Sequence, residues 1–188
     1  MENTLELRMY FLVPYNISPI QQAIQAGHAS LEYALSYAHN PFFLNFAQNW
    51  KTWIILNGGT TNGSVNDDGT SEGDYKGTLD NIQLELSKAQ IDHSKFYEPD
   101  LNDALTAVCF IADERVFNYK DYPDFHEWIV TQEIVNEDEK LASYTDVKGK
   151  TTEELKQIFP GMYPQWIRFL GGDKNVFLRE LLKYKKLA

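Results

Sequence analysis

The sequence predicts an α/β fold: a small mixed four-stranded sheet with flanking helices in residues 1–117, followed by a helical C-terminal extension in residues 118–188. Three observations support this prediction. Four short runs rich in β-branched and aromatic residues are interleaved with two segments of helical periodicity. A tight turn alone separates the last two runs. After residue 117 the chain changes to helical segments broken by pairs of Pro and Gly, and this part is expected to be too short for a core of its own.

The first strand is expected at residues 6–13, an apolar run ended by Pro14, which cannot donate to a sheet ladder. A helix follows to about residue 37, and Ser18 with Gln21 three residues later gives the pattern of a capping box at its start. One stripe of this helix repeats at spacings of three and four residues and is expected to be its apolar, core-facing stripe: Ile20, Ile24, Gly27, Leu31, Ala34 and Ala38.

The second strand is expected at residues 52–56, closed by Asn57-Gly58-Gly59, and a glycine-rich loop is expected over residues 57–77. A helix capped by Thr78 or Asp80 and running through Ile82, Leu86 and Ala89 is expected next. It leads to a strand at residues 94–98, a turn at residues 98–103 and a buried strand at residues 104–112. This order implies strands that are parallel where helices cross over and antiparallel where the hairpin closes.

Charge and composition exclude several classes of protein. The chain has a net charge of −10, and residues 1–117 hold 6 basic and 15 acidic residues, so any contact with a phosphate backbone must rest on a few local cations. A single cysteine excludes a disulfide framework, and the four histidines lack metal-ligand spacing, so no metal and no cofactor are expected. No apolar run is long enough for a membrane span and no basic leader precedes the first strand, which predicts a cytoplasmic protein without membrane contacts.

A polar row lies beside the apolar stripe of the long helix. Its members fall within about 60° on a helical wheel advancing about 100° per residue: Gln21, Gln25, His28 and Glu32. Such a row is expected at the rim of the sheet, where a ligand groove would lie. The alternative is that Gln25 and His28 only hydrogen-bond neighbouring backbone.

The motif Gln25-Ala26-Gly27-His28-Ala29 on a capped helix between two strands resembles the type II peptidyl-tRNA hydrolases. The resemblance extends from Arg8 to about Asp113, and Gln25, His28 and Ala29 match the family motif directly. Gln21 occupies the position of the family's helical lysine, and Glu98-Pro99-Asp100-Leu101-Asn102 replaces its Asp-Ala-Gly-Arg-Thr stretch. The added extension is similar to the elaborations found when viruses or mobile elements reuse a compact enzyme fold.

The resemblance implies hydrolysis of an ester on a tRNA-type substrate. This reaction needs a base to activate water, a donor for the oxyanion and contacts to the nucleotide. We expect catalytic roles for His28, Asp100 and Thr106. Binding roles are expected for Gln21, Gln25, Glu32, Glu98 and Asp103, and the base is left open among His28 and the three acids of the hairpin.

A second hypothesis is a catalytically inactive binding module on the same fold, which would hold a nucleotide-like small ligand or a protein partner. The replacement of the family's lysine by Gln21 and the acidity of residues 1–117 favour it. The aromatic segment at residues 159–170 is expected to pack the extension onto the sheet, or else to form a partner surface.

Overall fold

The structure, a computed structural model, describes residues 5–61, 77–132 and 147–188. The chain forms two compact units: Met1–Asp113 together with Glu180–Ala188, and Glu114–Arg179. The division falls at Asp113, close to the boundary expected at residue 117, but the last nine residues join the first unit. Among the described residues, no helix is long and apolar enough to cross a membrane.

The first unit is built on a mixed four-stranded sheet of order β2-β1-β4-β3, as the sequence predicts. β1 is parallel to β2 and antiparallel to β4, and β4 is antiparallel to β3. The central strands β1 and β4 are almost completely buried because neighbours cover both of their faces. The strands are β1 (Leu7–Pro14), β2 (Thr52–Gly59), β3 (His93–Glu98) and β4 (Ala104–Asp113).

The strand ends match the predicted ones to within one residue, except at the end of β2. β1 includes Pro14 as its last residue, where the register with β2 shifts, so the missing N–H costs no regular ladder bond. β2 continues through Gly59. At Gly58 there is no room for a side chain because α3 packs closely on this part of the strand: a Cβ on Gly58 would lie 2.5 Å from Cδ2 of Leu79. The rest of the predicted glycine-rich loop, residues 62–76, lies outside the described residues.

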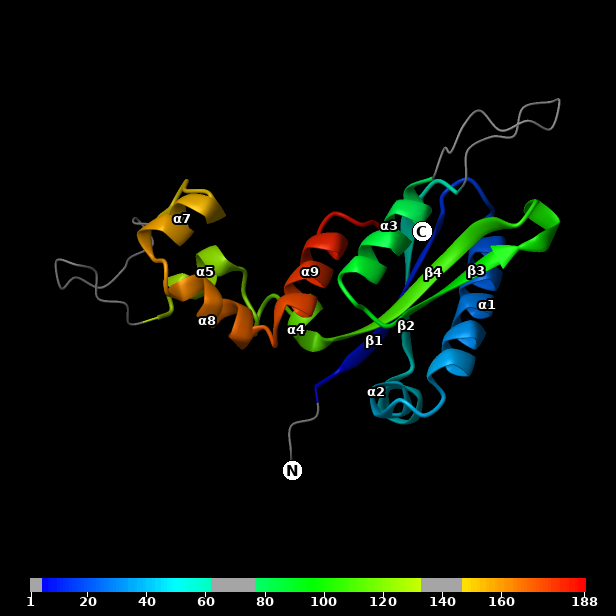
Figure 1. Ribbon diagram of the computed structural model, residues 1–188, viewed down its shortest axis with the longest axis horizontal. Helices are drawn as coiled ribbons and strands as arrows, with labels where there is room; N and C mark the ends of the chain where they lie inside the picture. Colours follow the sequence, from blue (N-terminus) through cyan, green and yellow to red (C-terminus); the bar gives the residue numbers. More distant parts are fainter. Residues whose placement is uncertain (1–4, 62–76, 133–146) are drawn as a thin grey trace. The chain divides into compact units, whose positions relative to one another are not determined.

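Helices α1 (Pro19–Tyr37) and α3 (Thr78–Lys88) cover opposite faces of the sheet (Figure 1). Alternation along β1 explains this: Phe11 packs with α1, whereas Leu12 lies on the side of Leu79 in α3. α2 (Pro41–Asn45) and the π-helix η1 (Phe46–Trp50) connect α1 to β2, and the 3₁₀-helix η2 (Pro99–Leu101) connects β3 to β4.

The predicted core-facing stripe of α1 points to solvent instead. Ile20 is 72% exposed and Leu31 is 64% exposed, whereas Ala26, Ala29 and Tyr33 on the opposite side are fully buried. The expectation was wrong because β1 presents large residues to this helix, and small alanines let the helix backbone approach them. Two glutamines, Gln22 and Gln25, are also buried on this face, and each has a hydrogen-bond partner.

The second unit has an apolar core of its own, contrary to the expectation that this segment is too short for one. The core side chains are Phe125, Trp128, Ile129, Val147, Leu155, Phe159, Trp166 and Leu170. They come mainly from short helices, so the aromatic segment at residues 159–170 packs within this unit. The helices are α4 (Glu114–Phe117), α5 (Phe125–Ile129), α7 (Thr152–Ile158), α8 (Met162–Phe169) and α9 (Asp173–Leu182), the last of which runs on into the first unit.

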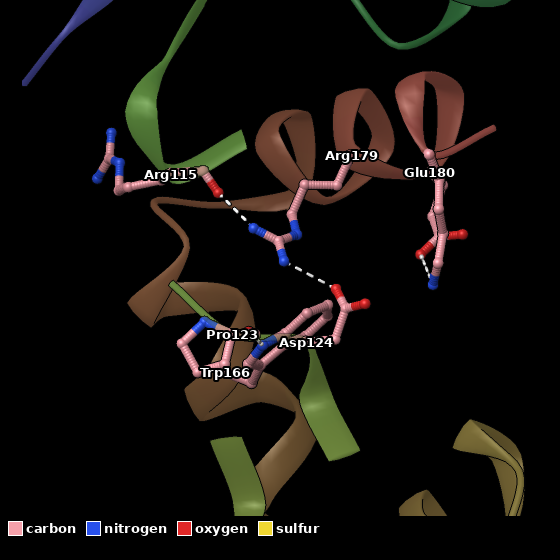
Figure 2. Close-up of polar contacts among 7 residues, drawn as sticks. Arg115, Pro123, Asp124, Trp166, Arg179 and Glu180 are labelled. Atoms are coloured by element: carbon pink, nitrogen blue, oxygen red, sulfur yellow. Dashed lines mark hydrogen bonds and ion pairs between the residues drawn. The ribbon is translucent and has the colours of Figure 1, made fainter. Parts of the chain in front are cut away.

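A buried arginine organises the second unit. Arg179, 1% exposed, donates from Nη1 to the Arg115 carbonyl oxygen and from Nη2 to Asp124, each at 2.8 Å (Figure 2). Its guanidinium carbon also lies 4.1 Å from the ring centre of Tyr119. Trp166 donates its indole N–H to the carbonyl of Pro123 beside this cluster, so one polar network joins the start of the unit to its last residue.

Candidate functional site

An irregularity in the hairpin of β3 and β4 determines where Thr106 points. Phe96 pairs with Ala107 and Tyr97 pairs with Leu105, which leaves Thr106 as an extra residue in β4. Such a bulge redirects a side chain that would otherwise follow the alternation of the strand. The Thr106 hydroxyl is fully buried and lies 2.7 Å from Oε1 of Gln25 on α1.

Gln25 is the centre of a chain of hydrogen bonds between helix and hairpin. Its Oε1 accepts from Thr106, and its Nε2 donates to Oε2 of Glu98 at 2.5 Å. The amide is therefore oriented at both ends, and the half-buried Glu98 carboxylate is held in a fixed position. The other oxygen of Glu98, Oε1, has no protein partner within the described part of the chain.

His28 lies one turn after Gln25 on α1, and its ring packs against Phe96 in a tilted arrangement with 4.4 Å between ring centres. Phe96 and Glu98 are two residues apart on β3, so both project toward α1. The Nδ1 atom of His28 is buried and has no hydrogen-bond partner among the described residues. The imidazole and the free oxygen of Glu98 thus lie on the same helix–strand seam with unused hydrogen-bonding capacity.

The other sequence candidates do not join this group. Gln21 is exposed, and its Oε1 accepts from the backbone N and the hydroxyl of Ser18 in the capping box. Glu32 is exposed on α1. Asp100 and Asp103 are exposed in the turn between β3 and β4, where Asp103 has a φ of 54°. Asp100 and Asp103 are thus turn residues of a type common at such corners, whereas Glu98 is the acid that contacts α1.

The electrostatics of the site are those of a carboxylate without a neighbouring cation. Within the described residues, no lysine or arginine pairs with Gln25, His28, Glu98 or Thr106. Lys95 projects from the other side of β3, where its ammonium lies 5.3 Å from the ring centre of Tyr97. The described residues also contain no cluster of three groups suited to a metal ion.

Sequence reasoning missed Phe96, which positions His28, and it missed the direct contact between Glu98 and Gln25. The bulge that turns Thr106 toward Gln25 has a weak sequence signal. Ala104 to Ala112 is uniformly apolar apart from Thr106, and one hydroxyl in such a run indicates a buried partner.

Comparison of the chain with known protein families and with curated proteins finds no match.

Proposed function

We propose that this chain hydrolyses an ester of the aminoacyl- or peptidyl-tRNA type, at a site made by Gln25, His28, Glu98 and Thr106. One observation supports the proposal. Gln25 is held between Thr106 and Glu98, and this fixes a carboxylate that keeps one free oxygen, two residues along β3 from the Phe96 ring that the His28 imidazole contacts. A fixed carboxylate with a free oxygen is suited to accept a proton from water. The proposal includes a fold of the first unit that resembles the type II peptidyl-tRNA hydrolases.

In the proposed reaction, Glu98 Oε1 takes a proton from a water molecule whose oxygen attacks the ester carbonyl. The second N–H of the Gln25 amide and an N–H of His28 face the oxyanion that forms. When this intermediate collapses, the bond to the ribose oxygen breaks, and the proton held by Glu98 passes to that oxygen. The products are a free acid and a free hydroxyl, and the site returns to its starting state.

The test is release of N-acetylated amino acid from N-acetyl-aminoacyl-tRNA at low salt, where contacts between local cations of the protein and the tRNA phosphates are strongest. Glu98→Gln keeps an acceptor for Gln25 and removes the base, so kcat should fall about 10²- to 10⁴-fold with little change in KM. Glu32→Gln makes the same change in charge on the exposed side of α1 and should retain the full rate. Asp100→Asn should behave like Glu32→Gln.

Inactivity of the unmodified, folded protein at low salt refutes hydrolysis. Equal losses in Glu98→Gln and Asp100→Asn refute the assignment of the base. Loss of activity in Glu98→Gln alone, with an intact fold by circular dichroism, supports both.

The second candidate is a binding module without catalysis. The observation that favours it is Gln21, whose side chain is used by the capping box at the position where the resembling family has a lysine. Such a module would bind adenosine without cleaving N-acetyl-aminoacyl-tRNA. Titration calorimetry with adenosine tests this, because Gln25→Ala and His28→Ala should abolish the heat of binding while Glu32→Gln keeps it. Absence of binding by the unmodified protein refutes the module.

A further inference from the structure

The outward face of α1 carries a row of large apolar side chains that nothing in the described structure covers. Their exposed fractions are high: Ile20 72%, Ile24 48%, Leu31 64% and Leu35 78%. Ala23 and Gly27 lie between them, and a Cβ built on Gly27 would meet no atom within 4 Å. We call these six residues the outer stripe. It lies opposite the face of α1 that packs on the sheet.

The outer stripe does not have the composition of a solvated helix face. The only Asp, Glu, Lys or Arg in the 19 residues of α1 is Glu32, whereas these four residue types make up 23% of the whole chain. Exposed helix faces are normally rich in charge, and a contiguous apolar patch marks an interaction site.

The four large residues of the outer stripe are placed symmetrically about the point between Gly27 and His28. Ile20 and Leu35 are equally far from that point, and so are Ile24 and Leu31. A pattern that reads the same in both directions fits a copy of itself in antiparallel orientation, with large residues facing large ones. Gly27 lies at the centre, where a missing side chain allows two helix backbones to approach each other.

We propose that a second copy of this chain covers the outer stripe, so that two α1 helices pair antiparallel about a twofold axis between Gly27 and His28. In this arrangement Ile24 of each copy faces Leu31 of the other, and Ile20 faces Leu35. The proposal does not depend on the proposed function, because Gln25, Glu98 and Thr106 lie on the sheet side of α1 and the ring of His28, the site residue next to the axis, packs against Phe96 of β3.

The charges of α1 do not oppose this pairing. Glu32 lies 4.5 residues from the centre, so the two copies of Glu32 are about 13 Å apart along the helices at a rise of about 1.5 Å per residue. This separation exceeds the screening length of about 8–10 Å at physiological salt. Glu32 lies at the flank of the outer stripe, about 90° from its centre at about 100° per residue, so the pairing brings no two like charges of α1 together.

The size of the outer stripe sets the expected strength of the dimer. An Ile or Leu side chain offers about 100 Å² of apolar surface. The four large residues therefore expose roughly 250–300 Å² per copy at their observed fractions. Two copies bury roughly twice that area plus the surface of the small residues, which is at the low end of specific interfaces. We expect a dimer with a dissociation constant on the order of 10–100 μM.

Sedimentation velocity of the full chain, from about 5 to about 300 μM, tests the dimer, since this range brackets the expected dissociation constant. The weight-average mass should rise from 21.7 kDa toward twice that value. Ile24→Lys should abolish the rise, with at least a tenfold weaker association. The substitution lowers the net negative charge of the chain, so general repulsion between copies cannot explain a loss. Tyr184→Lys, at an 84% exposed residue outside α1, is the matched control and should leave association unchanged.

A charge pair tests the antiparallel register. Leu31→Glu alone should also abolish association, whereas Ile24→Lys combined with Leu31→Glu in one chain should restore it, because each new lysine then faces a new glutamate twice per dimer. Circular dichroism should show an intact fold in all variants, since both positions point away from the core.

Three results overturn the proposal. The first is a monomer at all concentrations, and the second is association that Ile24→Lys leaves unchanged. The third is failure of the double variant to associate while both single variants fold, which excludes this register. If the protein is monomeric and a thiol reagent reacts slowly with Ile24→Cys, another segment of the same chain covers the outer stripe.

Discussion

Replacement of Arg179 by methionine is expected to destabilise the second unit strongly. Methionine keeps most of the length and volume of the side chain but removes its charge and donors. The change deletes two hydrogen bonds of 2.8 Å, to the Arg115 carbonyl and to Asp124, and the contact with the Tyr119 ring. Asp124 keeps its negative charge and loses the guanidinium that faces it.

The magnitude follows from burial. Removal of one partner of a buried ion pair costs about 3–5 kcal/mol because the other charge stays behind. The side chain of Asp124 is 31% exposed, so water can solvate part of its carboxylate and the loss falls toward the lower end. Relief of the desolvation of the arginine lowers it further. We expect a loss of about 2–4 kcal/mol in the free energy of unfolding of this unit.

Urea denaturation followed by tryptophan fluorescence measures this loss, because Trp128 and Trp166 belong to the core of the second unit. With a slope of about 2 kcal/mol per molar urea, the midpoint should fall by about 1–2 M. Arg168→Met makes the same replacement at an exposed position of α8 and should change the stability by less than about 0.5 kcal/mol. A loss below about 1 kcal/mol for Arg179→Met would refute the view that this network holds the unit together.

Two further perturbations concern the first unit. Burial raises the pKa of the Cys109 thiol to about 12. The pKa of the Tyr33 phenol is also raised, and burial is again the largest cause. The unfolded chain therefore releases protons that the folded chain keeps. The free energy of unfolding should be constant below about pH 8.5 and fall above it, by at most about 1.4 kcal/mol per pH unit from the thiol, with the phenol adding above about pH 10. Urea melts at several pH values between 8 and 10 check this, and a slope that Cys109→Ala leaves unchanged contradicts it. Gly58→Ala places a methyl group 2.5 Å from Leu79 and should cost about 1–3 kcal/mol in thermal melts, whereas Gly27→Ala, with open space around it, should not destabilise. Equal effects of the two substitutions would contradict the close approach of α3 to β2.

The order of strands and helices was predictable because each element of the first unit carries its own local signal. β4 is an uninterrupted apolar run, and the capping box at Ser18 has the predicted hydrogen bonds. The orientation of α1 was not predictable in this way. Both of its faces are rich in apolar residues, and only the size of the residues on β1 and β4 decides that Ala26 and Ala29 turn inward.

The candidate site was predictable in its residue types but not in its connections. Gln25, His28, Glu98 and Thr106 all follow from the sequence, and three of them are linked by hydrogen bonds. Whether Thr106 reaches the helix depends on its being a single unpaired residue in β4, and the periodicity of the strand does not predict such a bulge.

Residues 186–188 lie antiparallel to part of β2, where the N–H of Asn57 donates to the carbonyl of Lys186 and the N–H of Ala188 donates to the carbonyl of Ile55. β2 is an edge strand, so these bonds close part of a border that would otherwise be open to another strand. About 130 residues separate β2 from this cover in the sequence. At a synthesis rate of about 5–20 residues per second, the edge of β2 stays bare on the ribosome for roughly 6–26 s. During that interval the nascent sheet has the exposed edge strand typical of aggregation-prone intermediates. Any protection of this edge must then come from another molecule that binds the nascent chain.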